Sequence, residues 1–237
     1  DILAGTAQER RMDAKYVKKL LSVGVPMGLQ FSITAIGSIM LQSANNALGR
    51  DCVAAFTAAM RIKMFVICPA ESLGIAMSTF AGQNYGAGKP KRVWAGVKST
   101  FVMGMIYVAA ISTVLFLFSD TITLLFVDAS DTAIIANTVL ANHVAATFLP
   151  MLALLCNLRY TIQGVGFTNF AMLSGVMEMI ARTVVSVVFV PMYGYIAVCY
   201  GDSMAWCAAC LFLVPAFCYV YGKIKKHEYV SPLKAED

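Results

Sequence analysis

Six runs of mostly apolar residues, separated by short polar segments, make up most of this 237-residue sequence. An apolar helix needs about 20 residues to cross a bilayer, and each run is about that long. Hydrophobic residues account for 59% of the chain and charged residues for 13%, whereas soluble proteins carry about 25% charged residues. The excess apolar surface must face lipid, so the sequence predicts an all-α, polytopic membrane bundle of six transmembrane helices.

The predicted membrane helices cover 20–45, 53–81, 94–118, 134–157, 167–190 and 203–222. The segment 1–19 is polar and basic, and it predicts either a cytoplasmic linker or a short amphipathic helix on the membrane surface. The segment 223–237 predicts a cytoplasmic tail. The chain opens with no initiator Met and no signal-peptide pattern, so we expect it to be a fragment of a longer protein.

The basic residues of the polar segments fall on alternate connections between the six runs. This asymmetry predicts that both termini of a multi-pass protein of the cell (inner or plasma) membrane lie in the cytoplasm. The formal charge of +5 therefore reflects orientation in a lipid bilayer, and no nucleic-acid partner is expected. The residues concerned are Arg10, Arg11, Lys15, Lys18, Lys19, Lys89, Lys91, Arg92, Lys98, Arg159, Lys223, Lys225 and Lys226.

The second run carries three charged residues in an apolar background, namely Arg61, Lys63 and Glu71. Charges inside a membrane helix are expensive and commonly functional. Lys63 and Glu71 lie about 80° apart around a helix and about 12 Å apart along it, so each needs another partner: water, a neighbouring helix or a ligand. We expect these side chains to line a polar cavity. In the alternative, Arg61 and Lys63 extend to the interface and Glu71 is a satisfied core carboxylate.

Three further charged positions and one amide lie in or beside the apolar runs. Glu178 and Arg182 are spaced i, i+4, which predicts an ion pair within one helix or, alternatively, direct coupling to an ion or substrate. Arg159 is predicted to be an orienting charge at the cytoplasmic end of the fourth helix. Gln30 predicts a hydrogen bond between helices or a contact with a ligand.

The sequence contains no recognisable catalytic constellation, so we expect no enzyme activity, no metal and no cofactor. His143 stands alone in an apolar run and predicts a hydrogen-bonded structural residue or a proton relay. Cys207 and Cys210 have CxxC spacing but lie in an apolar helix without a second pair, which favours buried core residues. The stretch GQNYGAGK at 82–89 lacks the spacing of a phosphate-binding loop and follows a membrane helix instead of a strand.

Three stretches together resemble the multidrug and toxic compound extrusion (MATE) transporters. They are PAESLGIAMSTFAGQNYGAG at 69–88, LLSVGVP at 20–26 and LRYTIQGVGFTN at 158–169. Members of that family have twelve helices in two similar six-helix lobes. The resemblance covers essentially the whole chain and implies the carboxy-terminal lobe, whose partner would be the missing amino-terminal lobe of the same transporter.

The resemblance implies export of small organic, often cationic, drugs by alternating access, in exchange for Na⁺ or H⁺. Glu71 is then expected to be neutralised by the substrate cation or a proton, with Lys63 and Arg61 setting its ionisation. Branches of the family carry an acid in the helices matching 20–45 and 134–157, and this sequence has none there.

Glu71 and Glu178 are therefore expected to be the only intramembrane carboxylates, unless the coupling site lies in the missing half. Two alternatives stay open: a lipid or lipid-linked oligosaccharide flippase of the same superfamily, and a membrane assembly subunit that does not transport.

Overall fold

A computed structural model describes residues 14–226 of the chain as a bundle of helices, with no strand among them. The helices are α1 (Ala14–Asn46), α2 (Arg50–Gly86), α3 (Pro90–Thr123), α4 (Thr132–Gly164), α5 (Thr168–Val184), a π-helical turn η1 (Val185–Phe189), α6 (Val190–Tyr193) and α7 (Tyr195–Lys226). The fifth span runs without interruption from Thr168 to Tyr193. The described residues thus contain six helices long and apolar enough to cross a membrane, and the predicted fold class is confirmed.

The helices are longer than the sequence predicted. The predicted bounds stopped at charged or polar residues, but α4 continues past Arg159 to Gly164, and α7 begins at Tyr195, before the predicted start at 203. α1 begins at Ala14, inside the segment predicted to be a linker or interfacial helix. Residues 1–13 and 227–237, which hold the rest of that segment and most of the predicted tail, lie outside the described residues.

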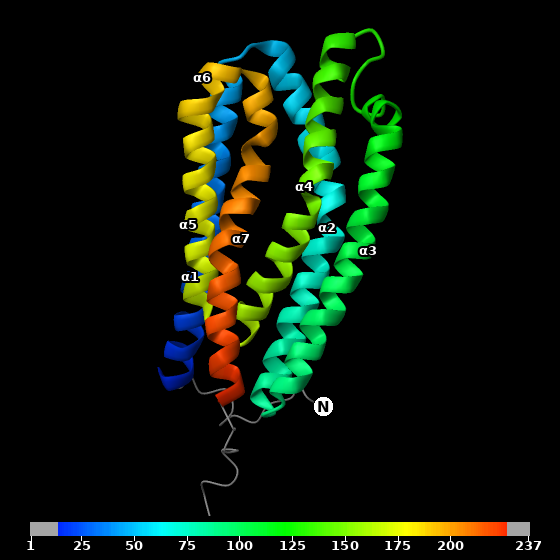
Figure 1. Cartoon of the computed structure of the whole chain (residues 1–237). Coiled ribbons are helices and arrows are strands. Elements are labelled where there is room, and N and C mark those ends of the chain that lie inside the picture. The colour runs from blue at the N-terminus through cyan, green and yellow to red at the C-terminus, as the bar shows by residue number, and fades with distance from the viewer. Residues whose placement is uncertain (1–13, 227–237) are drawn as a thin grey trace, which may run out of the picture.

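The six spans form an elongated bundle in which α1, α5 and α7 make one group and α2, α3 and α4 make the other (Figure 1). The main packing between the two groups is between α4 and α7. The connections α2–α3 and α4–α5 lie at the end of the bundle where α1 begins and α7 ends, and the connections α1–α2 and α3–α4 lie at the other end. Gly49 (φ 101°) and Gly88 (φ 67°) let the chain turn between helices in a backbone region that other residues rarely adopt.

Small residues let the backbones of α2 and α4 approach closely. A Cβ atom added to Gly164 would lie 2.2 Å from the carbonyl oxygen of Ser78, and one added to Gly82 would lie 2.9 Å from the carbonyl oxygen of Gly164. Such contacts between small residues are a common way to pack helices in lipid. They fix the spacing of the helices that carry Glu71 and Arg159.

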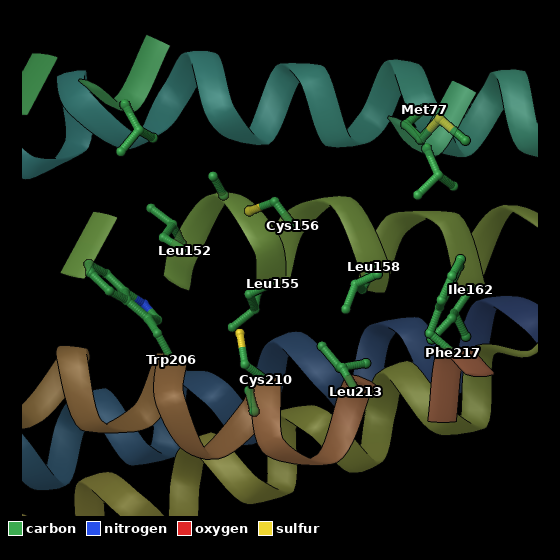
Figure 2. Packing of buried hydrophobic residues seen from close by; sticks show 14 of the residues in the cluster. Met77, Leu152, Leu155, Cys156, Leu158, Ile162, Trp206, Cys210, Leu213 and Phe217 are labelled. Carbon is green, nitrogen blue, oxygen red and sulfur yellow. The ribbon is translucent and has the colours of Figure 1, made fainter. Parts of the chain in front are cut away.

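The largest buried apolar cluster fills the space between α2, α3, α4 and α7 (Figure 2). Leu155 and Leu213 are among its fully buried side chains. In contrast, large apolar side chains on the outside remain open, such as Phe65 at 75% and Leu211 at 79% exposure. Exposed apolar surface on this scale is expected of a protein whose solvent is lipid.

Candidate functional site

A cavity of about 220 Å³ lies between α1, α2, α4, α5 and α7. Three acidic and three basic side chains line it, among apolar residues of the same helices. The cavity therefore holds charged side chains inside an apolar bundle. Of the three charged residues of the second run, Lys63 and Glu71 line it and Arg61 does not. The charged and amide residues of the cavity are Gln30, Lys63, Glu71, Arg159, Glu178, Arg182 and Asp202.

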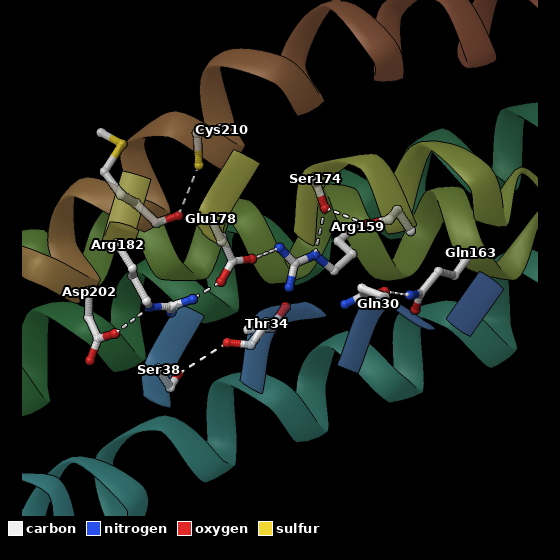
Figure 3. Close-up of polar contacts among 12 residues, drawn as sticks. Gln30, Thr34, Ser38, Arg159, Gln163, Ser174, Glu178, Arg182, Asp202 and Cys210 are labelled. Atoms are coloured by element: carbon white, nitrogen blue, oxygen red, sulfur yellow. Dashed lines mark hydrogen bonds and ion pairs between the residues drawn. The ribbon is translucent and has the colours of Figure 1, made fainter. Parts of the chain in front are cut away.

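Five of these side chains form a continuous chain of ion pairs, which we call the charge ladder. Arg159 binds Glu178 through Nη2 and Oε1. The other carboxylate oxygen of Glu178 lies 3.2 Å from Nη2 of Arg182, and Nε of Arg182 donates to Oδ1 of Asp202 at 2.8 Å. Asp202 in turn accepts from Nζ of Lys63 through Oδ2. Figure 3 shows the ladder from Arg159 to Asp202.

Burial makes the ladder a strongly coupled unit. Glu178 is 3% and Arg182 is 4% exposed, so neither charge is solvated by bulk water. A buried charge requires a close opposite charge and hydrogen bonds, because desolvation otherwise costs several kcal/mol per ion. The alternating signs meet that requirement and tie together α2, α4, α5 and α7.

The structure contains the predicted i, i+4 pair of Glu178 and Arg182. The prediction for Arg159 is wrong: it is a buried member of the ladder and not an orienting charge at the helix end. Its Nε donates to Oγ of Ser174 at 3.1 Å while Nη2 binds Glu178. The helix continues for another turn beyond Arg159, to Gly164, and this places the guanidinium beside α5.

Asp202 corrects a second expectation, that Glu71 and Glu178 are the only intramembrane carboxylates. The last helix was predicted to begin at 203, which leaves Asp202 just before it, next to Gly201. In the structure α7 has already begun at Tyr195, and Asp202 faces Lys63 and Arg182. An aspartate following the apolar stretch YIAVCYG was the available signal for this site.

Glu71 differs from the other two carboxylates because it has no hydrogen bond or ion pair within residues 14–226. Its side chain is exposed and lines both the 220 Å³ cavity and a neighbouring open groove of about 920 Å³. Lys63 and Arg61 line the same groove, but Lys63 is bound to Asp202 in the ladder and Arg61 is exposed. The structure brings the three residues to one surface without pairing them.

Gln30 is 3% exposed and accepts a hydrogen bond at Oε1 from Nε2 of Gln163. This contact joins α1 to α4, as one of the two interpretations of Gln30 predicted. Gln163 was not singled out from the sequence, because an amide near a helix end gives no specific signal. Figure 3 shows the two amides next to each other, beyond the Arg159 end of the ladder.

His143, Cys207 and Cys210 lie apart from the cavity, whereas Cys156 is part of its lining. The His143 ring packs on Phe116 with 5.2 Å between ring centroids, and within residues 14–226 its Nε2 has no hydrogen-bond partner. Cys210 donates to the carbonyl oxygen of Met151 at 3.2 Å. In the part of the chain that is described, His, Cys, Asp and Glu form no group of three that could hold a metal ion.

Comparison with known proteins identifies the family. The family model MatE matches residues 26–190, well over half of the chain. The chain belongs to the MATE family. The match spans the helices that supply the cavity, apart from α7, so the resemblance seen in the sequence is confirmed.

Curated MATE relatives are similar to this chain over part of their length. The probable multidrug resistance protein YoeA of Bacillus subtilis (strain 168) is 29% identical over 130 residues, which are 55% of this chain and 28% of YoeA. The probable multidrug resistance protein YpnP of the same organism is 36% identical over 74 residues, 31% of this chain and 17% of YpnP. The chain therefore matches less than a third of the length of either relative.

Solved MATE structures have the same fold. A MATE crystal structure in complex with MaL6 aligns with a TM-score of 0.86 and 20% identity, over 93% of this chain and 50% of that one. A transporter of the MOP superfamily from Pyrococcus furiosus Vc1 (DSM3638), whose binding pocket is described as having reverse polarity that suggests a different function, aligns with a TM-score of 0.81 and 19% identity, over 95% and 50% of the two chains. This MATE chain thus corresponds to half of a transporter.

Proposed function

We propose that this chain is the carboxy-terminal lobe of a cation-coupled antiporter that exports organic, often cationic, compounds across the cell membrane. Relatives named as probable multidrug resistance proteins support the choice of substrate class. The matched solved chains, of which this chain covers about half, support a second lobe as the partner. The lobe contributes one wall of a central path for the substrate.

Glu71 is the observation that carries this proposal. It is a carboxylate without a partner in the described residues, at the junction of a 220 Å³ cavity and a 920 Å³ groove. A negative charge on an apolar wall gains most from a cation that arrives with its own apolar surface. The groove supplies that surface through residues such as Met64, Phe65 and Ile67, and methionine side chains adapt to ligands of varied shape.

A single carboxylate can couple export to an ion gradient by competition. A substrate cation and either Na⁺ or H⁺ would each neutralise Glu71, so binding of one would favour release of the other. The two lobes then rock between states in which the cavity opens to one side of the membrane or the other. In this mechanism the charge ladder keeps the lobe rigid, because four of its helices are joined by buried ion pairs.

The charge distribution supports a cytoplasmic location for the end of the bundle where α1 begins and α7 ends. Lys89 lies in the α2–α3 connection at that end, and Lys91 and Arg92 lie in the first turn of α3 (Figure 1). At the opposite end, the α3–α4 connection carries Asp128 and Asp131 and no basic residue. Arg159 is buried and so no longer counts among the orienting charges. The remaining charges still favour the same orientation in the membrane.

A reconstituted system tests the proposed activity. The full-length protein would be placed in liposomes with ethidium as a cationic substrate, and Na⁺ and pH gradients would be imposed one at a time. We expect ethidium to move against its own gradient under one of the two and to stop when that gradient is collapsed. Absence of gradient-driven movement under both would contradict the proposal.

A flippase with an anionic substrate is the second candidate, and a specific observation favours it. Lys63, Arg159 and Arg182 all line the cavity, and cations on the cavity wall are what an anionic head group requires. Their pairing with Glu178 and Asp202 offsets most of that charge, so we rank export of cations first. Movement of a fluorescent anionic lipid, in liposomes where ethidium does not move, would reverse this order.

A further inference from the structure

Two polar atoms beside the charge ladder lack partners. Nη1 of Arg182 and Oγ1 of Thr34 are buried and form no hydrogen bond with any described residue. Both side chains line the 220 Å³ cavity, and Figure 3 shows them on facing parts of α5 and α1. An unpaired guanidinium N–H in a buried site is costly, so these two donors are available to bind a ligand in the cavity.

Small residues hold these two donors at the contact between α1 and α5. A Cβ atom added to Gly175 would lie 3.2 Å from Oγ1 of Thr34, and one added to Gly37 would lie 3.4 Å from Cδ of Arg182. Each of the two side chains therefore lies against a glycine of the opposite helix. The position of both donors is set by the fold.

The five residues of the ladder carry a net positive charge, and Glu71, the third acid on the cavity wall, forms no ion pair with any of them. The ladder contains three cations, Lys63, Arg159 and Arg182, and two anions, Glu178 and Asp202, so its formal charge is 3 − 2 = +1. Both oxygens of each carboxylate already bind a ladder cation. A buried net charge lowers its free energy by acquiring a counter-ion, and a neutral water molecule cannot supply one.

We propose that this cavity binds a small monovalent anion, a halide or a carboxylate group, between Nη1 of Arg182 and Oγ1 of Thr34. The anion completes the hydrogen bonds of both donors and neutralises the ladder. Glu71 lines the same cavity without a partner, so the bound anion and the Glu71 carboxylate repel each other. The anion site does not depend on the export proposal, because it is detected by binding and not by transport.

Thermal unfolding of the purified full-length protein tests this site. Chloride, bromide or acetate would be titrated against the bulky sulfonate MES at constant ionic strength, which separates specific binding from screening. We expect a saturable rise of the unfolding temperature with the anion that fits. A rise with acetate alone would identify the carboxylate of an organic substrate as the ligand. A rise with both chloride and bromide would identify a free halide.

Thr34→Val removes one donor and leaves every ion pair of the ladder in place. We expect it to weaken the apparent anion affinity about three- to tenfold, as the loss of one hydrogen bond does, while Arg92→Gln, on the surface of α3, changes nothing. Glu71→Gln removes the repelling charge and should tighten binding. A wild-type protein without a saturable response, or a Thr34→Val variant that responds as the wild type does, would overturn the proposal.

Discussion

Nζ of Lys63 in α2 binds the Asp202 carboxylate of α7, 139 residues further along the chain. This pair connects the group of α2, α3 and α4 to the group of α1, α5 and α7. The pair of Arg159 and Glu178 makes a second connection, from α4 to α5. The polar centre of the lobe thus crosses the boundary between the two groups twice, and the apolar contact of α4 with α7 accompanies it.

Replacing Glu178 with Gln should strongly destabilise the lobe. The substitution leaves Arg159 without its ion-pair partner and Arg182 with only Asp202, and both cations stay buried. Loss of one partner from a buried pair costs about 3–5 kcal/mol. Thermal unfolding of the detergent-solubilised protein, followed by size-exclusion chromatography, would measure the change.

Glu71→Gln is the matched control for that experiment, because it makes the same chemical change at a glutamate without an ion pair in the described residues. We expect its unfolding temperature to stay close to that of the wild type. Equal destabilisation by the two substitutions would mean that the ladder does not hold the lobe together.

A double-mutant cycle on Lys63 and Asp202 should reveal coupling between α2 and α7. Asp202→Asn should be more damaging than Lys63→Met, because it deprives both Lys63 and Arg182 of a charge partner. The double variant should lose less stability than the sum, with a coupling of about 0.5–3 kcal/mol. Lys63→Met combined with Asp128→Asn, in the distant α3–α4 connection, should be additive, and additivity in both cycles would contradict the pairing.

Gly164→Ala should push α2 and α4 apart. The new methyl group would lie 2.2 Å from the carbonyl oxygen of Ser78, and a clash with backbone cannot be relieved by turning a side chain. We expect a loss of about 1–3 kcal/mol. Gly222→Ala in α7 meets no atom within 4 Å and should be neutral or slightly stabilising, since alanine favours a helix by about 1 kcal/mol over glycine. A change in stability of the same sign in both variants would argue against this close approach.

The sequence alone predicted the helices better than it predicted the site. Long apolar runs determine how many spans form, because each backbone group in lipid must be bonded within its own helix. The pair of Glu178 and Arg182 was predictable because i, i+4 spacing places two side chains on one helix face. Gln30 was predictable only as an amide seeking a partner, without the identity of Gln163.

The long-range part of the ladder could not be predicted from local pattern. Arg159 and Asp202 stand near the predicted ends of apolar runs, where a charge is normally solvated. Their burial depends on where α4 ends and where α7 begins, and on partners 19 and 139 residues away. No local spacing encodes a contact of that kind, so these residues were assigned to the membrane surface.

The proposed orientation predicts opposite labelling of the two ends of the bundle. In a background without the seven native cysteines, Asp128→Cys should react with an impermeant maleimide in intact cells. Lys91→Cys should react only after the membrane is opened, because the end of the bundle where α3 begins is proposed to lie in the cytoplasm. The reverse pattern would place both termini outside.

The rate of ethidium export by the full-length Glu71→Gln protein tests the central claim most directly. Glu71 is the carboxylate proposed to bind the substrate cation and the coupling ion, and its replacement leaves the charge ladder intact. We predict at least a tenfold fall in gradient-driven export, with an unfolding temperature and an expression level like those of the wild type. Export at the wild-type rate by this variant would show that the unpaired carboxylate does not carry the transport reaction.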